Sequence, residues 1–267
     1  MAIRLGIDVG GTFTDFLLFD EGKETFHLHK TPSTPEDQSV GILHGIRSLL
    51  AQADLSPDDI QSILHGTTVA TNIVLEEKGA RVGLLVTENF EQVLHLARSQ
   101  TPGPLAGWIT MDKPQPLADL ELTRGVPERI NAQGEILRPL DENRAREMTD
   151  ELVRKGADSI TISLLHAYAN PVHEQRLRDV IASAYPDLPI SLSSQILPEF
   201  REYERTLVTV MNAYVRPGMR RYLDNFRHKL ENERFNSRLH IVRSDSGLMS
   251  VERAMESPVY TLSLIHI

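Results

Sequence analysis

Leu5-Gly-Ile-Asp-Val-Gly-Gly-Thr-Phe-Thr-Asp15 carries the strongest structural signal in this 267-residue chain. Apolar residues on both sides of it predict two strands, over residues 3–8 and 13–20. Gly10 and Gly11 can adopt the positive φ angles that a two-residue hairpin turn requires. A carboxylate, a glycine turn and hydroxyls at a strand end suit a phosphate group and its Mg²⁺ ion. The alternative is an ordinary hairpin whose glycines serve only its geometry.

We expect Asp8 to orient Mg²⁺-bound water near a transferred phosphoryl group, rather than only to cap the strand end. Strand alternation sends Thr14 and Asp15 to opposite faces, so that one faces the site and the other satisfies a local backbone group. The residues assigned to catalysis are Asp8, Thr12 and Asp15. The residues assigned to phosphate binding are Gly10, Gly11, Thr12 and Thr14.

Composition narrows the class of protein. The net charge of −9 argues against nucleic acid or an anionic membrane as the main partner. Without cysteine, the chain has no disulfide, thiolate metal site or catalytic thiol. His27 and His29 share a strand face but have no evident third ligand, so zinc is not favoured. No apolar run reaches membrane-spanning length, and we expect a cytoplasmic protein.

Periodicity predicts alternating strands and helices along most of the chain. Ser33 or Thr34 is expected to cap the first helix, and Pro217 to break or kink the last long one. Residues 99–140 are rich in proline and are predicted to be an irregular functional excursion that contains two short strands, near 126–130 and 135–137. The other expected strands are 24–30, 60–64, 82–86, 159–165, 190–192 and 239–242, and the expected helices are 36–53, 69–78, 142–155, 171–185 and 203–231.

Asp8-Val-Gly-Gly-Thr-Phe-Thr-Asp15 resembles the first phosphate-binding hairpin of the ATPase superfamily of actin, sugar kinases and heat-shock chaperones. Through Thr14 and Asp15 it is similar to the hydantoinase/oxoprolinase family in particular. The similarity covers residues 3 to about 262 and follows the family's order. The other stretches that carry it are His65-Gly-Thr-Thr-Val-Ala-Thr-Asn72, Val126-Pro-Glu-Arg-Ile130 with Asp141-Glu142, Glu199-Phe-Arg-Glu-Tyr-Glu-Arg-Thr206, Asn212-Ala-Tyr214 and Ser244-Asp-Ser-Gly-Leu248.

The resemblance implies an α/β fold, the ribonuclease-H-like first lobe of that superfamily, with an irregular inserted segment and the start of a second region. It implies ATP and Mg²⁺ as cofactors, a small-molecule substrate and a B-type hydantoinase or carboxylase subunit as partner. The implied activity is that of an ATP-dependent cyclic-amide hydrolase of the N-methylhydantoinase A or 5-oxoprolinase type, which phosphorylates a lactam or amide carbonyl before ring opening.

Three alternatives stay open at this point. The first is an acetone or acetophenone carboxylase-type subunit that phosphorylates a ketone enolate at the same ATP site. The second is a non-catalytic assembly module for a partner subunit. The third is a sugar-kinase relative, which shares the first motif but not the later ones.

His65-Gly66-Thr67-Thr68 follows a strand and precedes a helix, which is where α/β sheets collect ligands. Thr67 and Thr68 could donate to phosphate or substrate, and Asn72 shares a helix face with Thr68. We assign His65, Thr67, Thr68 and Asn72 to the substrate or phosphate side. The plainer alternative is a threonine helix cap beside a core histidine that is hydrogen-bonded to backbone.

Two later stretches are assigned to the substrate or to a subunit interface. The charged run 199–206 reads by default as a solvated helix start, and the resemblance favours an ordered role. The loop at Ser244 is either part of the active cleft or a turn before a helix cap at Ser250, and relatives often carry glycine where this chain has Ser246. The assigned residues are Arg201, Glu202, Glu204, Arg205 and Asp245.

The superfamily's nucleotide site needs a second glycine-rich hairpin, and this chain has a single Gly-Gly pair, at Gly10-Gly11. We therefore expect an N-terminal fragment that is inactive alone and supplies half of a site. The expected domains are the hydantoinase/oxoprolinase N-terminal domain, 1–185, the truncated beginning of the main domain, 186–262, and a non-native tail, 263–267.

Overall fold

A computed structural model describes residues 2–34, 37–98 and 115–262 of the chain. These residues form two compact units, one of residues 1–79 with 215–267 and one of residues 80–214. The first part of the expected irregular segment, 99–114, and the expected tail, 263–267, lie outside the described residues. These units are compact parts of the structure and are not sequence domains, so the domain limit expected near residue 185 stays a prediction.

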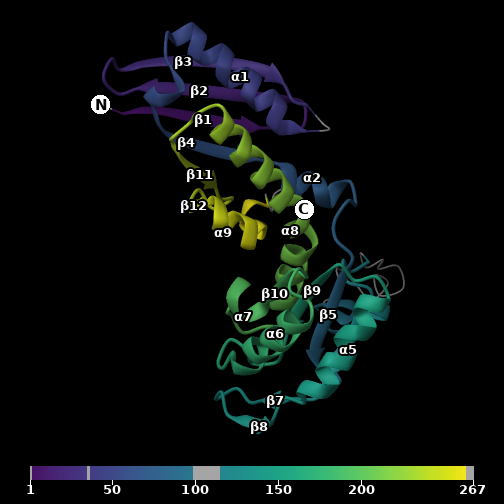
Figure 1. The fold of residues 1–267 in the computed structure, drawn as a ribbon. Helices are drawn as coiled ribbons and strands as arrows, with labels where there is room; N and C mark the ends of the chain where they lie inside the picture. The colour runs from purple at the N-terminus through teal and green to yellow at the C-terminus, as the bar shows by residue number, and fades with distance from the viewer. Residues whose placement is uncertain (1, 35–36, 99–114, 263–267) are drawn as a thin grey trace, which may run out of the picture. The chain divides into compact units, whose positions relative to one another are not determined.

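The first unit is built on a six-stranded mixed sheet in the order β12-β11-β4-β1-β2-β3 (Figure 1). The strands β1, β2 and β3 form an antiparallel meander, whereas β4 pairs parallel to β1 and β11 parallel to β4. The bounds are β1 Ile3–Val9, β2 Phe13–Asp20, β3 Thr25–Pro32, β4 Ile60–Thr67, β11 Arg238–Val242 and β12 Leu248–Ser250.

Alternation along the strands separates a packed face of this sheet from an open one. Leu5, Ile7 and Val9 of β1 are buried in one core with residues of α1, Gln38–Ala53, and of the C-terminal part of α8, Glu202–Asn232. On the opposite face, Leu17 and Leu28 are 42% and 73% exposed. The shorter helices of this unit are α2 Val69–Leu75 and α9 Val251–Glu256, with 3-10 turns at Pro57–Asp59 and Pro258–Thr261.

The second unit has a four-stranded parallel sheet in the order β10-β9-β5-β6. β5 and β9 are buried on both faces, and β5 reads as a nearly continuous apolar run, whereas β9 alternates isoleucine with serine and threonine. The bounds are β5 Val82–Thr87, β6 Thr123–Val126, β9 Ser159–Ser163, β10 Ile190–Leu192, α3 Val93–Leu96, α5 Glu142–Arg154, α6 Val172–Ala184, α7 Ser193–Ile196 and a 3-10 turn at Leu120–Leu122. A separate hairpin, β7 Arg129–Ile130 and β8 Ile136–Arg138, turns at Gly134.

The structure confirms the expected α/β class and most of the expected elements, with two corrections. Asp37 is the N-cap residue of α1, because its carboxylate accepts from the Ser39 backbone N–H. Of the two expected residues only Thr34 contacts this helix end, where its hydroxyl accepts from the Gly41 N–H at 3.0 Å. Of the two effects expected of Pro217, the break does not occur, since α8 is continuous from Glu202 to Asn232, and the kink stays a prediction. The expected N-caps Asp141 and Ser250 are confirmed.

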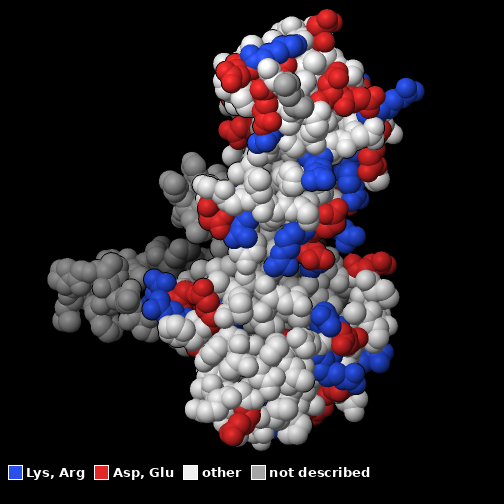
Figure 2. Space-filling model, turned by 90° about the vertical axis from the view of Figure 1, so that its left-hand side faces the viewer, with Lys and Arg blue, Asp and Glu red and all other residues white. Residues whose placement is uncertain are grey.

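Charges of both signs are interspersed on the face seen in Figure 2, where the described residues form no broad area of one sign. Among the described residues, no helix has both the length and the apolar character needed to cross a bilayer.

Gly45 lets α1 lie directly on β2, because an added Cβ would overlap the Phe16 ring. Gly45→Ala is therefore expected to lower the free energy of unfolding by about 1–3 kcal/mol, the usual effect of overpacking a core. Urea unfolding of the chain measures this change. The matched control is Ser48→Ala on the exposed side of α1, and an equal effect of the two substitutions would contradict the packing.

Candidate functional site

Two loops meet at the carboxyl ends of β1 and β4. The parallel register places Asp8 beside Gly66 and Val9 beside Thr67. Both the backbone N–H and the side-chain hydroxyl of Thr68 donate to the Val9 carbonyl at 3.1 Å. These hydrogen bonds tie the turn after β1 to the loop before α2. The sequence predicts each of the two segments but not the contact between them.

The glycine turn is closed by a hydrogen bond from the Gly10 N–H to the Phe13 carbonyl, at 3.0 Å. Neither Gly10 nor Gly11 has a positive φ, so the expected reason for the glycines is wrong. Close approach is the physical reason at Gly10, where a Cβ would lie 3.1 Å from the Phe13 carbonyl oxygen. A Cβ at Gly11 would meet only the Asn72 amide nitrogen, at 4.0 Å, so that open space lies above this residue.

Ser33 braces this turn and was misread from the sequence as a helix cap. Its hydroxyl donates to the Gly10 carbonyl at 2.8 Å and lies 3.0 Å from the Thr14 hydroxyl. Its backbone N–H donates to the Thr12 carbonyl at 2.9 Å. Thr14 is fully buried and faces the core, where its side chain does not reach a phosphate at the turn. Only the register of β2 with β3 brings Ser33 to this place.

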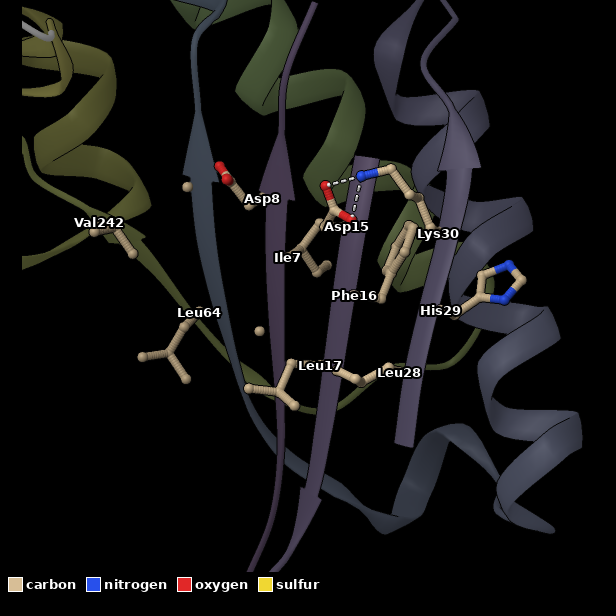
Figure 3. Close-up of a pocket in the computed structure, with 12 residues that line it drawn as sticks. Ile7, Asp8, Asp15, Phe16, Leu17, Leu28, His29, Lys30, Leu64 and Val242 are labelled. Atoms are coloured by element: carbon tan, nitrogen blue, oxygen red, sulfur yellow. Dashed lines mark hydrogen bonds and ion pairs between the residues drawn. The ribbon is translucent and has the colours of Figure 1, made fainter. Parts of the chain in front are cut away.

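Asp8 and Asp15 lie opposite each other in β1 and β2 on the open face of the sheet (Figure 3). Lys30 binds both oxygens of Asp15, at 2.8 and 3.0 Å. Asp8 is exposed and has no hydrogen-bond or ion-pair partner among the described residues. A Cβ at Gly66 would lie 3.2 Å from an Asp8 oxygen, so glycine gives this carboxylate its room. Below the carboxylates lies a hollow of 610 Å³, with Leu17, Leu28 and Leu64 in its wall.

The loop between β4 and α2 offers hydroxyl and amide groups. Thr67 Oγ1 accepts a hydrogen bond from the Val69 N–H at 3.2 Å. Thr68 is the N-cap residue of α2, although its hydroxyl bonds Val9 rather than the helix. Asn72 is half-buried, and its amide nitrogen lies next to Gly11 as described above.

His65 does not face this site. Alternation along β4 turns its ring into the core, where it is fully buried against Phe226 and Tyr222. Its Nε2 lies 2.8 Å from the Tyr222 hydroxyl, and its Nδ1 has no hydrogen-bond partner within the described part of the chain. Burial lowers the pKa of His65 from 6.5 to about 3. The expected contact with phosphate or substrate is therefore replaced by the core position that the sequence left as the alternative, with a tyrosine rather than backbone as partner.

The charged run assigned to substrate or interface belongs to the second unit. Arg205 is 1% exposed, and its guanidinium donates to the carbonyls of Leu164 and Glu199 and to the Ser193 hydroxyl. This arrangement fixes the ends of β9 and α7, and it leaves Arg205 unable to reach a partner surface. Its buried neighbour Glu174 accepts from the Leu164 N–H at 2.9 Å, and burial raises the pKa of that carboxyl.

Of the remaining assigned residues, Glu204, Arg201 and Asp245 have local partners. Glu204 pairs with Arg98 at 2.5 Å, Arg201 stands over the Phe200 ring, and Glu202 begins α8. Asp245 binds the Arg243 guanidinium and accepts from the Gly247 N–H at 3.1 Å. Ser246 has a φ of 66°, a conformation that glycine adopts most easily.

In the described ranges, no group of three or more His, Cys, Asp or Glu side chains is placed to hold a metal ion. The free carboxylate of Asp8 nevertheless fits Mg²⁺, which takes one or two carboxylates and completes its shell with water and substrate phosphates.

Two family models match most of the chain. The model described as hydantoinase/oxoprolinase N-terminal region matches residues 4–185, and the one described as hydantoinase/oxoprolinase matches residues 205–263. The acetophenone carboxylase gamma subunit of Aromatoleum aromaticum is 32% identical over 96% of this chain and 37% of its own length. The caprolactamase subunit alpha of Pseudomonas jessenii is 35% identical over 83% of this chain and 32% of its own.

Two solved structures of similar proteins have the same fold over nearly the whole chain. A nucleotide-free acetone carboxylase structure matches with a TM-score of 0.86 at 27% identity, over 97% of this chain and 39% of that chain. The ATP-dependent caprolactamase of Pseudomonas jessenii matches with a TM-score of 0.83 at 30% identity, over 96% of this chain and 38% of the caprolactamase chain. The chain thus spans between 32% and 39% of the length of each of the matched relatives and structures named here.

The buried His65 makes the stability of the first unit depend on pH. Its pKa is lower in the folded chain, about 3, than in the unfolded one, about 6.5. The unfolded state therefore binds the extra proton below pH 6.5, and the free energy of unfolding falls as the pH decreases. Between pH 6.5 and 5 we expect this residue to remove about 2 kcal/mol.

Urea unfolding at both pH values, on wild type and His65→Gln, isolates that contribution. The variant is expected to lose less stability on acidification. Parallel losses in the two proteins would show that His65 is not the group that takes up the proton.

Proposed function

The chain belongs to the hydantoinase/oxoprolinase family, and on that premise we propose that it supplies the first phosphate-binding part of an ATP-dependent cyclic-amide hydrolase. In the proposed reaction the amide or lactam carbonyl oxygen attacks the γ-phosphorus of ATP, and ADP leaves. Water then adds to the activated carbonyl carbon. The ring C–N bond breaks, the nitrogen takes a proton, and an acyl phosphate remains. A second water attacks its carbonyl carbon, and inorganic phosphate leaves with the original carbonyl oxygen, so that the sum consumes one ATP and two water molecules.

One observation carries the proposal: the free carboxylate of Asp8 lies between the Gly10-Gly11 turn and the Gly66-Thr67 loop. Carboxyl ends of parallel strands are where α/β proteins hold their ligands. Here they combine exposed backbone at Gly11 and Thr12, a threonine loop and an amide side chain. Each of these groups can donate to phosphate oxygens at close range.

The proposed roles follow from where each group points. The backbone of Gly11 and Thr12 and the Asn72 amide would hold phosphate oxygens, since the space above Gly11 is open. Asp8 would hold water of the Mg²⁺ ion and orient it, and the ion would neutralise charge on the phosphates. Asp15 lies on the same face of the sheet as Asp8 and is ion-paired with Lys30. We therefore assign to Asp15 an influence on the electrostatic potential of the site rather than a direct role in catalysis.

A carboxylase subunit that phosphorylates a ketone enolate is the second candidate. Two matched proteins favour it, the acetophenone carboxylase gamma subunit and acetone carboxylase. The same phosphate site would serve both reactions, so that substrate, not ATP use, separates the candidates. A purely structural role in assembly is the third candidate.

Subunit names among the relatives support a partner subunit, which we propose to be of the B type. The domain limit near 185 and a cytoplasmic location are also kept as proposals.

Recovery of the neighbouring gene sequence is the first experiment. The full-length product, purified with any adjacent B-type subunit, is then assayed for ADP release with hydantoins, 5-oxoproline, caprolactam and acetone. Stimulation by a cyclic amide supports the first candidate, and stimulation by the ketone with bicarbonate supports the second. No ADP release with any of them would contradict both.

Asp8→Asn in that full-length protein is expected to lower substrate-stimulated ADP release about 100-fold, because the carboxylate that orients Mg²⁺-bound water is lost. Asp54→Asn is the matched control. Asp54 is the exposed C-cap residue of α1, and its backbone has the left-handed conformation, which asparagine also adopts readily. Unchanged turnover in Asp8→Asn would refute the role assigned to Asp8.

A further inference from the structure

The open face of the six-stranded sheet carries a row of apolar residues that crosses neighbouring strands. The register places Gly6 of β1 between Leu17 of β2 and Leu64 of β4, and it places Leu17 beside Leu28 of β3. Figure 3 shows the three leucines in the wall of the hollow below the carboxylates. Leu28, Leu17, Gly6 and Leu64 are called the leucine row below.

An aromatic pair extends the leucine row on the same face. Phe19 and Phe26 lie opposite each other on β2 and β3, two residues along the strands from Leu17 and Leu28. Their rings are stacked with centroids 4.6 Å apart, and Phe26 is 63% exposed. Single exposed apolar residues are ordinary, but contiguous ones mark a surface that another element covers.

Nothing in the described part of the chain explains why residue 6 is glycine. Its φ is not positive, and an added Cβ would meet only Leu17 atoms, at ordinary distances of 3.7 and 3.9 Å. Glycine weakens a strand interior, and one reason for it there is the close approach of another backbone. The packed face of the same sheet already uses glycine in this way, at Gly45 of α1.

Two ion pairs border the leucine row. Asp15 and Lys30 bind each other at 2.8 Å on the side of the candidate site, and Arg4 of β1 pairs with Glu21 at 2.5 Å on the other side. Because these charges neutralise each other, an apolar element can cover the row without leaving any of the four unpaired.

We propose that an amphipathic α-helix from the remainder of the full-length protein lies on the leucine row, with its closest approach at Gly6. Most of the length of the matched proteins lies outside the region that this chain spans, and it is available to supply the cover. A helix is expected because β1, β4 and β11 run parallel, and parallel strands are covered by helices on both faces. The proposal depends neither on ATP nor on the substrate.

The reactivity of an introduced thiol tests this cover. The chain has no cysteine, so Leu28→Cys places a single thiol of this region on the leucine row. Its reaction with N-ethylmaleimide is followed at that peptide by mass spectrometry, in the 267-residue chain and in the full-length protein purified without a partner subunit. The full-length protein is expected to react about tenfold more slowly, because a covered thiol reacts only when the covering element opens.

Leu137→Cys is the matched control, since Leu137 is also 63% exposed but lies on β8 of the second unit. Its thiol should react at the same rate in the two proteins. An equally fast reaction of Leu28→Cys in the two proteins would overturn the proposal.

Gly6→Ala, added to Leu28→Cys, tests the point of closest approach. In the 267-residue chain the added methyl group meets only ordinary contacts, so the rate of labelling should not change. In the full-length protein the methyl group overlaps the covering helix, and labelling should become about tenfold faster. An unchanged rate in the full-length protein would contradict the proposed contact at Gly6.

Cross-linking identifies the covering element. Photoreactive benzoylphenylalanine replaces Leu28 in an equal mixture of ¹⁵N-labelled and unlabelled full-length protein, with the B-type subunit present. Cross-links within one chain, to residues outside the region that this chain spans, support the proposal. Cross-links between labelled and unlabelled chains would assign the surface to a second copy, and cross-links to the B-type subunit would assign it to that partner; either result would overturn the proposal.

Discussion

Parallel pairing of β1 with β4 is the constraint on which the candidate site depends. These strands are separated in sequence by the β2–β3 meander and α1, yet residue-by-residue pairing runs from Arg4 with Ser62 to Val9 with Thr67. Hydrogen bonds and the burial of Leu5, Ile7 and Ile63 hold this register. A shift by one residue would turn Asp8 into the core and expose Ile7, so hydrophobic burial and the position of the carboxylate are enforced together.

The local part of the site could be predicted from sequence because its chemistry is contiguous. A strand, a carboxylate, two glycines and a threonine stand within a few residues, and alternation correctly separates Thr14 from Asp15. The reason for the glycines was not predictable, since it depends on how closely the Phe13 carbonyl approaches Gly10. The role of Ser33 was hidden for the same reason: a serine before a helix resembles a cap, and only the register with β2 reveals it as a brace.

Two charged or titratable residues show where sequence reasoning reaches its limit. Arg205 stands in a run of charges that resembles a solvated helix start, but its guanidinium donates to two backbone carbonyls, those of Leu164 and Glu199, and to the Ser193 hydroxyl. His65 begins a motif whose later residues, Thr67 and Thr68, are assigned to the phosphate or substrate side, and the parity of β4 alone decides that His65 faces inward. In both cases burial is tolerated because hydrogen bonds are available, a property that no short stretch of sequence displays.

The central claim is that the β1–β2 turn and the β4–α2 loop form one phosphate site. A structure of the full-length protein with Mg²⁺ and a non-hydrolysable ATP analogue tests it most directly. The account predicts phosphate oxygens within hydrogen-bond distance of both the backbone of Gly11-Thr12 and the hydroxyl of Thr67, with Asp8 facing the ion through water. Phosphates held by one of the two loops alone, or by neither, would contradict it.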